Sequence, residues 1–231
     1  MGQPRPELDG GPLTAPIVTA DHVSKRFTGT QALDDVSFAL TPGQVHGLIG
    51  ENGAGKSTLI KILGGVHAPD SGSISVNGAT VTLASPRDAL ANRIVVIPQE
   101  MHIVPAQSVA ENVMLGRLPM TRSLGLVPSV DRTLMANLTT ELLIRLNLDI
   151  NPDTLVGQLG YAERQLVMIA RALSRDARVL ILDEPTASLE AREVERLFQV
   201  IDGLKQDGVA IAYISHRLDE IDALADVCTV M

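Results

Sequence analysis

Residues 50–58 are Gly50-Glu51-Asn52-Gly53-Ala54-Gly55-Lys56-Ser57-Thr58, and the rest of the chain is organised around them. They match the pattern G-x-x-x-x-G-K-[ST] of a phosphate-binding P-loop. An apolar segment, residues 45–49, precedes them as a predicted buried strand, and residues 58–63 have the apolar spacing of a helix. A glycine-rich turn between a strand and a helix directs backbone N–H groups and the positive helix end at one point. A glycine-rich turn that arose by chance would not combine the preceding strand, the following helix, the lysine and the serine. The stretch therefore predicts a nucleoside triphosphate site.

Lys56 and Ser57 have side chains suited to that ligand. The ammonium group is expected to reach the β- and γ-phosphates, and the Ser57 hydroxyl is expected to join the Mg²⁺ shell. The turn thus predicts ATP with Mg²⁺ as the bound species.

Residues 179–186, Val-Leu-Ile-Leu-Asp-Glu-Pro-Thr, form a second strong pattern. An apolar strand that ends in two carboxylates places acid at the carboxyl end of a sheet, where α/β proteins bind ligands. Asp183 suits a water-mediated Mg²⁺ contact, because Mg²⁺ keeps several of its waters. Glu184 is placed to polarise an attacking water. The alternative, two solvated acids at a strand end, is disfavoured beside a P-loop.

The composition is that of a globular protein with one domain, or one domain carrying a subdomain. Of its 231 residues 45% are hydrophobic and 20% charged. The formal net charge of -8, without any basic stretch, argues against nucleic acid as a partner. No apolar run approaches the length that crosses a membrane. The single cysteine, Cys228, is expected to be a buried core thiol, and the composition predicts a cytosolic protein.

The order of predicted elements indicates an α/β fold. Residues 1–16 contain four prolines and three glycines and predict a disordered tail. Fully apolar strands at residues 95–97, 179–182 and 210–214 are of the parallel type, whereas residues 73–76 alternate. Residues 108–172 are predicted to be helical. The chain is thus expected to have a P-loop NTPase core, a mostly parallel sheet flanked by helices, with an antiparallel β portion and an inserted helical subdomain at about residues 100–172.

From about residue 17 to the last residue, these patterns together resemble the nucleotide-binding domain of ABC transporters. The resemblance implies that Gln99 contacts Mg²⁺ and water and senses the membrane subunit, that His216 contacts the γ-phosphate, and that Phe27 stacks on adenine. For each of these residues the alternative is a purely structural role: Phe27 as a core residue, Gln99 as a loop amide and His216 as a cap at the end of a strand. The family pattern implies catalysis by Lys56, Gln99, Glu184 and His216, ATP binding by Phe27 and residues 50–58, and Mg²⁺ binding by Ser57, Gln99 and Asp183.

Three short segments indicate a particular group within this family. Residues 97–100 (Ile-Pro-Gln-Glu), 109–117 and 215–220 resemble the first ATPase half of monosaccharide importers of the ribose, galactose and xylose type. In that group one polypeptide carries two such domains, so the implied partners are a second ATPase domain, membrane permease subunits and, indirectly, a periplasmic-type sugar-binding protein. The implied location is the cytoplasmic face of the membrane, through the permease. Because residues 227–231 predict a strand without its following turn, we expect a fragment of a longer tandem protein.

The ABC signature, close to L-S-G-G-Q in the family, is altered here. Gly160 stands where the serine is expected, and Tyr161 and Ala162 stand at the two glycine places. The signature of one domain completes the ATP site of the other, so the change is expected to weaken the partner's site. Glu190 replaces a frequent aspartate of the D-loop.

Two other functions remain open at this point. A soluble ABC protein acting on ribosomes or DNA would need basic surface or coiled-coil insertions, and the sequence has neither. A regulatory module that closes on ATP with little turnover is favoured by the altered signature and opposed by Glu184 and His216. The favoured function is an ATP-hydrolysing subunit that drives monosaccharide import.

Overall fold

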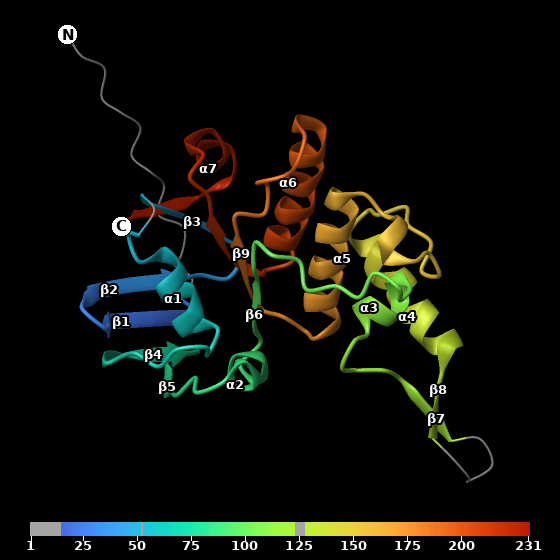
Figure 1. Ribbon diagram of the computed structural model, residues 1–231, viewed down its shortest axis with the longest axis horizontal. Coiled ribbons are helices and arrows are strands. Elements are labelled where there is room, and N and C mark those ends of the chain that lie inside the picture. The colour runs from blue at the N-terminus through green and yellow to red at the C-terminus, as the bar shows by residue number, and fades with distance from the viewer. Residues whose placement is uncertain (1–14, 52, 123–127) are drawn as a thin grey trace.

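The computed structural model describes residues 15–51, 53–122 and 128–231. Most of the predicted tail, residues 1–14, and the predicted ATP-binding residue Asn52 lie outside the described residues. A five-stranded parallel sheet forms the centre of the molecule (Figure 1). Its strands, in spatial order, are β11 (Val227–Val230), β3 (Val45–Ile49), β10 (Ala210–Ile214), β9 (Val179–Asp183) and β6 (Ile94–Ile97).

The central strands of this sheet are buried on both faces. Along β9, Val179 and Ile181 face one hydrophobic cluster, whereas Leu180 and Leu182 face another. Tyr213 of β10 joins the same cluster as Leu180. A strand covered on both faces needs apolar residues at every position, which is why the sequence shows continuous apolar runs here. This confirms the predicted α/β class.

A second, antiparallel sheet of order β2-β1-β4-β5 lies beside the parallel one. Its strands are β1 (Val18–Phe27), β2 (Thr30–Leu40), β4 (Ser71–Val76) and β5 (Ala79–Val81). Helix α1 (Lys56–Leu63) shares a hydrophobic cluster with both sheets, so it is buried between them. Helix α2 (Pro86–Ala91) follows β5 and was not predicted. Ser85 caps it by accepting a hydrogen bond from the Asp88 N–H.

A helical block follows β6 and lies at the far side of the molecule from β1 and β2 (Figure 1). It contains α3 (Val109–Val113), α4 (Arg132–Arg145), a 3₁₀ turn (Val156–Gln158) and α5 (Tyr161–Ser174). The expectation of helix throughout residues 108–172 is wrong in part, because β7 (Met120–Arg122) and β8 (Pro128–Val130) pair antiparallel there. Such short strands leave no periodic pattern to detect.

Two further helices follow strands of the parallel sheet: α6 (Ala191–Gln206) comes after β9, and α7 (Leu218–Leu224) comes after β10. The predicted burial of Cys228 is wrong: the thiol is exposed, because β11 is an edge strand. In the described ranges, every helix falls short of the length and apolarity needed to cross a membrane.

Candidate nucleotide site

The parallel sheet gathers the predicted site residues at one edge. Ile214 of β10 is in register with both Leu48 of β3 and Asp183 of β9, and Ile97 of β6 is in register with Leu182. Four strands therefore end side by side. The segments that follow these ends carry the P-loop, Glu184, His216 and Gln99.

Two glycines shape the P-loop turn. Gly53 and Gly55 have φ angles of 91° and 101°, which L-residues with a side chain rarely adopt. A Cβ atom on Gly55 would lie 2.4 Å from the Ala32 carbonyl oxygen and 2.8 Å from Leu33 Cδ2, whereas one on Gly53 would meet nothing within 4 Å. Gly55 is therefore needed both for its backbone angle and for the close approach of β2.

Lys56 folds back over the turn. Its Nζ donates to the Gly50 carbonyl at 2.6 Å and to the Glu51 carbonyl at 3.0 Å, and the residue is only 8% exposed. Helix α1 begins here, and no side chain among the described residues caps its first turn. The N–H groups of a first turn have no partner inside the helix, so they are available to an anion.

Asp183 and Ser57 line the same pocket, which has a volume of about 460 Å³. Burial raises the pKa of the Asp183 carboxyl, neighbouring Glu184 raises it further, and Lys56 acts in the opposite direction. A hydroxyl and a carboxylate suit Mg²⁺, a hard cation that takes oxygen ligands. No cluster of three or more His, Cys, Asp or Glu in residues 15–51, 53–122 and 128–231 could hold a metal alone. This donor set fits a cation that is held partly by phosphate and water.

Glu184 and His216 meet at the edge of the sheet. Nδ1 of His216 lies 3.3 Å from Oε1 of Glu184, with the histidine side chain 62% and the glutamate side chain 23% exposed. Glu184 has a φ of 47°, unusual for a residue other than glycine. Its N–H donates to the Ile214 carbonyl at 3.0 Å, which ties the end of β9 to the end of β10.

Gln99 is exposed, two residues after β6. The segment that follows it is braced by Asn112 of α3 and Arg171 of α5. The Asn112 amide is fully buried and donates to the Val104 carbonyl at 2.9 Å. Arg171 donates to the carbonyls of His102 at 2.6 Å and Asn112 at 2.7 Å. The Gln99 segment is thereby joined to the helical block.

Phe27 ends β1 and is 40% exposed, which excludes the alternative of a core residue. Its ring makes an edge contact with His67, with centroids 5.1 Å apart, and Lys25 Nζ lies 5.7 Å from its centroid. An exposed aromatic ring can stack on a base.

The altered signature lies at the start of α5. Gly160 is the residue before the helix, and its N–H donates to the Glu163 carboxylate at 3.0 Å. The Glu163 carboxylate therefore lies at the N–H of Gly160, the residue that stands where the signature serine is expected. Ala162 is buried in this first turn.

Glu220 of α7 was not among the predicted site residues. Its carboxylate is buried and accepts hydrogen bonds from Thr186, Tyr213 and Ser215. An acidic residue on the apolar side of α7, next to buried Ile221, was the available signal.

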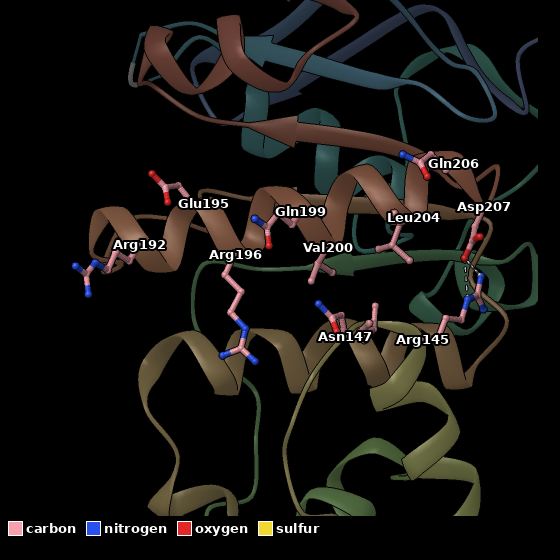
Figure 2. Close-up of a pocket in the computed structure, with 12 residues that line it drawn as sticks. Arg145, Asn147, Arg192, Glu195, Arg196, Gln199, Val200, Leu204, Gln206 and Asp207 are labelled. Carbon is pink, nitrogen blue, oxygen red and sulfur yellow. Dashed lines mark hydrogen bonds and ion pairs between the residues drawn. The ribbon is translucent and has the colours of Figure 1, made fainter.

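A second hollow, of about 640 Å³, lies between α6 and the turn after α4 (Figure 2). Arg145 crosses it and pairs with Asp207 at 2.6 Å, whereas Arg192 and Arg196 project from α6. None of the predicted site residues lines it. The hollow lies between α6 and the end of α4 in the helical block.

Residues 33–187 match the family described as ABC transporter. The chain belongs to the ABC transporter family. Membership implies nucleotide binding for this ABC chain, in agreement with the P-loop described above.

Curated relatives of the ABC chain are named as sugar import proteins. The arabinose import ATP-binding protein AraG 2 of Burkholderia thailandensis is 49% identical over 96% of the chain, which covers 41% of that relative. A putative ribose/galactose/methyl galactoside import ATP-binding protein of Rhizobium etli is 47% identical over 91% of the chain, covering 40% of its own length. The ABC chain therefore spans about two fifths of the length of these relatives.

Solved structures support the fold. A nucleotide-free ATP-binding cassette from an ABC transporter superposes with a TM-score of 0.82 at 27% identity, covering 94% of this chain and 88% of that one. The ADP conformation of an ATP-binding cassette gives the same TM-score at 28% identity and the same coverage of both chains. The ABC chain thus has the fold of an ATP-binding cassette.

Proposed function

We propose that this chain is an ATP-binding and ATP-hydrolysing domain that powers import of a monosaccharide. The observation that carries the proposal is the convergence of Lys56, Asp183 and the Glu184–His216 pair at one edge of the parallel sheet. The names of the relatives, which are import proteins for arabinose and for ribose or galactose, supply the substrate class.

The proposed chemistry is transfer of the γ-phosphoryl group to water. A bond forms between the water oxygen and the γ-phosphorus, the bond to the bridging oxygen breaks, and ADP and phosphate leave. Glu184 orients the water and accepts its proton, and His216 contacts the γ-phosphate beside it. Such reactions depend mostly on positioning and electrostatic stabilisation. A positioned base contributes typically ~10²–10⁴-fold.

The turn and the pocket wall hold the nucleotide in this proposal. Lys56, which now donates to two P-loop carbonyls, would exchange them for β- and γ-phosphate oxygens, since a charged donor prefers an anionic acceptor. Ser57, Asp183 and Gln99 would hold Mg²⁺, which neutralises phosphate charge when bound. Phe27 would stack on adenine, and the N–H groups of residues 50–58 would surround the phosphates.

We propose that residues 17–231 form one such domain, with a helical subdomain at about residues 100–172, inside a longer tandem-ATPase protein. The proposed partners are the second ATPase domain, the permease and, indirectly, a periplasmic-type binding protein. The exposed Gln99 segment, which Arg171 joins to the helical block, would contact the permease. Docking there would hold the domain peripherally at the cytoplasmic face of the membrane, with sugar selection left to the permease and binding protein.

A second candidate is a regulatory module that closes on ATP but turns over slowly. The Glu163 carboxylate at the N–H of Gly160 favours it, because a negative charge there opposes binding of the partner's phosphate. The two candidates differ in the turnover of the assembled transporter.

The test is Glu184→Gln in the full-length protein with its permease. It should bind ATP almost normally, because shape and hydrogen bonding survive, but lose both ATP turnover and sugar uptake into proteoliposomes. Glu195→Gln, on the exposed face of α6, is the matched control and should retain both activities. Wild-type turnover in Glu184→Gln would remove Glu184 as the base. A wild type that binds ATP with negligible turnover would favour the regulatory module.

A further inference from the structure

Glu220 is a buried carboxylate on which three hydroxyl groups converge. The residue is 2% exposed, and its Oε2 atom accepts hydrogen bonds from Thr186 Oγ1 at 2.8 Å, Tyr213 OH at 2.8 Å and Ser215 Oγ at 2.9 Å. Burying a charged group is costly unless it is paired and hydrogen-bonded. An apolar residue would fill this space without the cost of burying a charge. We therefore attribute the presence of a carboxylate here to the hydrogen bonds that it accepts.

The other carboxylate oxygen is paired with Arg217. Its NH1 atom lies 2.9 Å from Glu220 Oε1, an ion pair without the alignment of a hydrogen bond. The Arg217 N–H in turn donates to Ser215 Oγ at 3.0 Å. Burial raises the pKa of the Tyr213 hydroxyl, so this group remains a donor. Both oxygens of Glu220 are therefore occupied by groups from β10 and from the loops after β9 and β10.

Two of the three hydroxyl donors lie next to the Glu184–His216 pair along the chain. Thr186 comes two residues after Glu184, and Ser215 comes directly before His216. The Oε2 atom of Glu220 thus accepts hydrogen bonds from both segments that carry the Glu184–His216 pair.

The backbone of Glu184 needs such support. Its φ of 47° is a left-handed conformation that costs roughly 1–2 kcal/mol for an L-residue and persists only where the surroundings enforce it. One restraint is the hydrogen bond from the Glu184 N–H to Ile214. The bond from Thr186 to Glu220 is the second, two residues further along the same loop.

We propose that Glu220 is a positioning residue that fixes the separation of Glu184 and His216. The proposal rests on the function proposed above for that pair. Glu220 acts by holding the Thr186 side chain on one loop and the Ser215 side chain on the other, so that neither loop moves alone.

The test is Glu220→Gln, which keeps the length of the side chain but replaces one carboxylate oxygen with an amide NH₂. Turnover of ATP by the assembled transporter should fall about 10²-fold, the effect of a misplacement near 1 Å, with KM for ATP within about twofold of wild type. In the 231-residue chain, the ring resonances of His216, assigned by their loss in His216→Ala, should shift. Thr186→Val should reproduce part of the effect, and Thr186→Val with Glu220→Gln should be no slower than Glu220→Gln alone.

The matched control is Asp226→Asn. Asp226 accepts from the Val45 N–H at 2.8 Å and pairs with Lys205, at the opposite end of β3 from the P-loop. It should lower thermal stability while leaving turnover and the His216 resonances unchanged. The proposal is overturned if Glu220→Gln leaves turnover and the His216 resonances as they are in wild type, or only matches the control. If the wild type hydrolyses no ATP, the proposed function fails, whereas the His216 resonances still decide the role of Glu220.

Discussion

Gly55→Ala should destabilise the folded state for two reasons that can be measured separately. The φ of 101° costs roughly 1–2 kcal/mol once a Cβ is present. That Cβ would lie 2.4 Å from the Ala32 carbonyl oxygen, a backbone atom of β2 that cannot rotate away. The forced backbone shift adds typically about 1–3 kcal/mol. We therefore expect Gly55→Ala to lower the free energy of unfolding by about 2–5 kcal/mol.

Gly53→Ala separates the two costs. Its φ of 91° is similar, but an added Cβ meets nothing within 4 Å, so only the first cost, about 1–2 kcal/mol, applies. Urea unfolding of the nucleotide-free chain, followed by circular dichroism, measures both variants. Equal losses for Gly53→Ala and Gly55→Ala would refute the argument that β2 limits the space at the P-loop.

Lys56→Ala should abolish measurable ATP binding in calorimetry, because it removes the cation expected at the β- and γ-phosphates; an unchanged affinity would contradict the P-loop assignment. Asp183→Asn should raise the melting temperature of the nucleotide-free chain at pH 7, because burial raises the pKa of this carboxyl and its ionisation therefore costs folding free energy. That cost is present above the raised pKa and absent below the ordinary one, so the gain should vanish in melts near pH 3; the same variant should weaken the Mg²⁺ dependence of ATP binding. Gly160→Ser should fit, since an added Cβ meets only Glu163 Oε2 at 3.8 Å, and should change turnover at the partner's site without changing ATP affinity at Lys56. The chain alone should be largely monomeric with little ATPase activity; a rapidly hydrolysing homodimer in light scattering and turnover assays would overturn the interpretation of the altered signature.

The parts of the fold that were predicted are those with local, repetitive patterns. Strands β9 and β10 are buried on both faces, so each appears in the sequence as a run of apolar residues. Helix α6 buries one face, with Leu197, Val200, Ile201 and Leu204, and therefore shows helical spacing. Since parallel strands end at one edge of a sheet, the sequence alone predicts that the segments after them lie close together.

The parts that were not predicted depend on contacts between distant residues. Thr186 and Glu220 are 34 residues apart, and neither shows in its own neighbourhood that the two side chains meet. Cys228 stands among valines, yet the strand order leaves it at an edge, and strand order is a property of the whole sheet. Strands β7 and β8 have only three residues each, too few for a period to emerge.

The left-handed backbone of Glu184 also affects how this position can vary in evolution. Asparagine and aspartate adopt such angles more readily than glutamate, so selection for a stable fold alone would replace Glu184. A substitution such as Glu184→Asn is expected to preserve or improve the melting temperature while it shortens the carboxylate arm and removes its charge. With Glu184 in the role proposed above, stability and activity have opposite requirements at this residue. A lineage that no longer needs hydrolysis can lose Glu184 without any penalty in folding, and the loss would leave a domain that still binds its nucleotide.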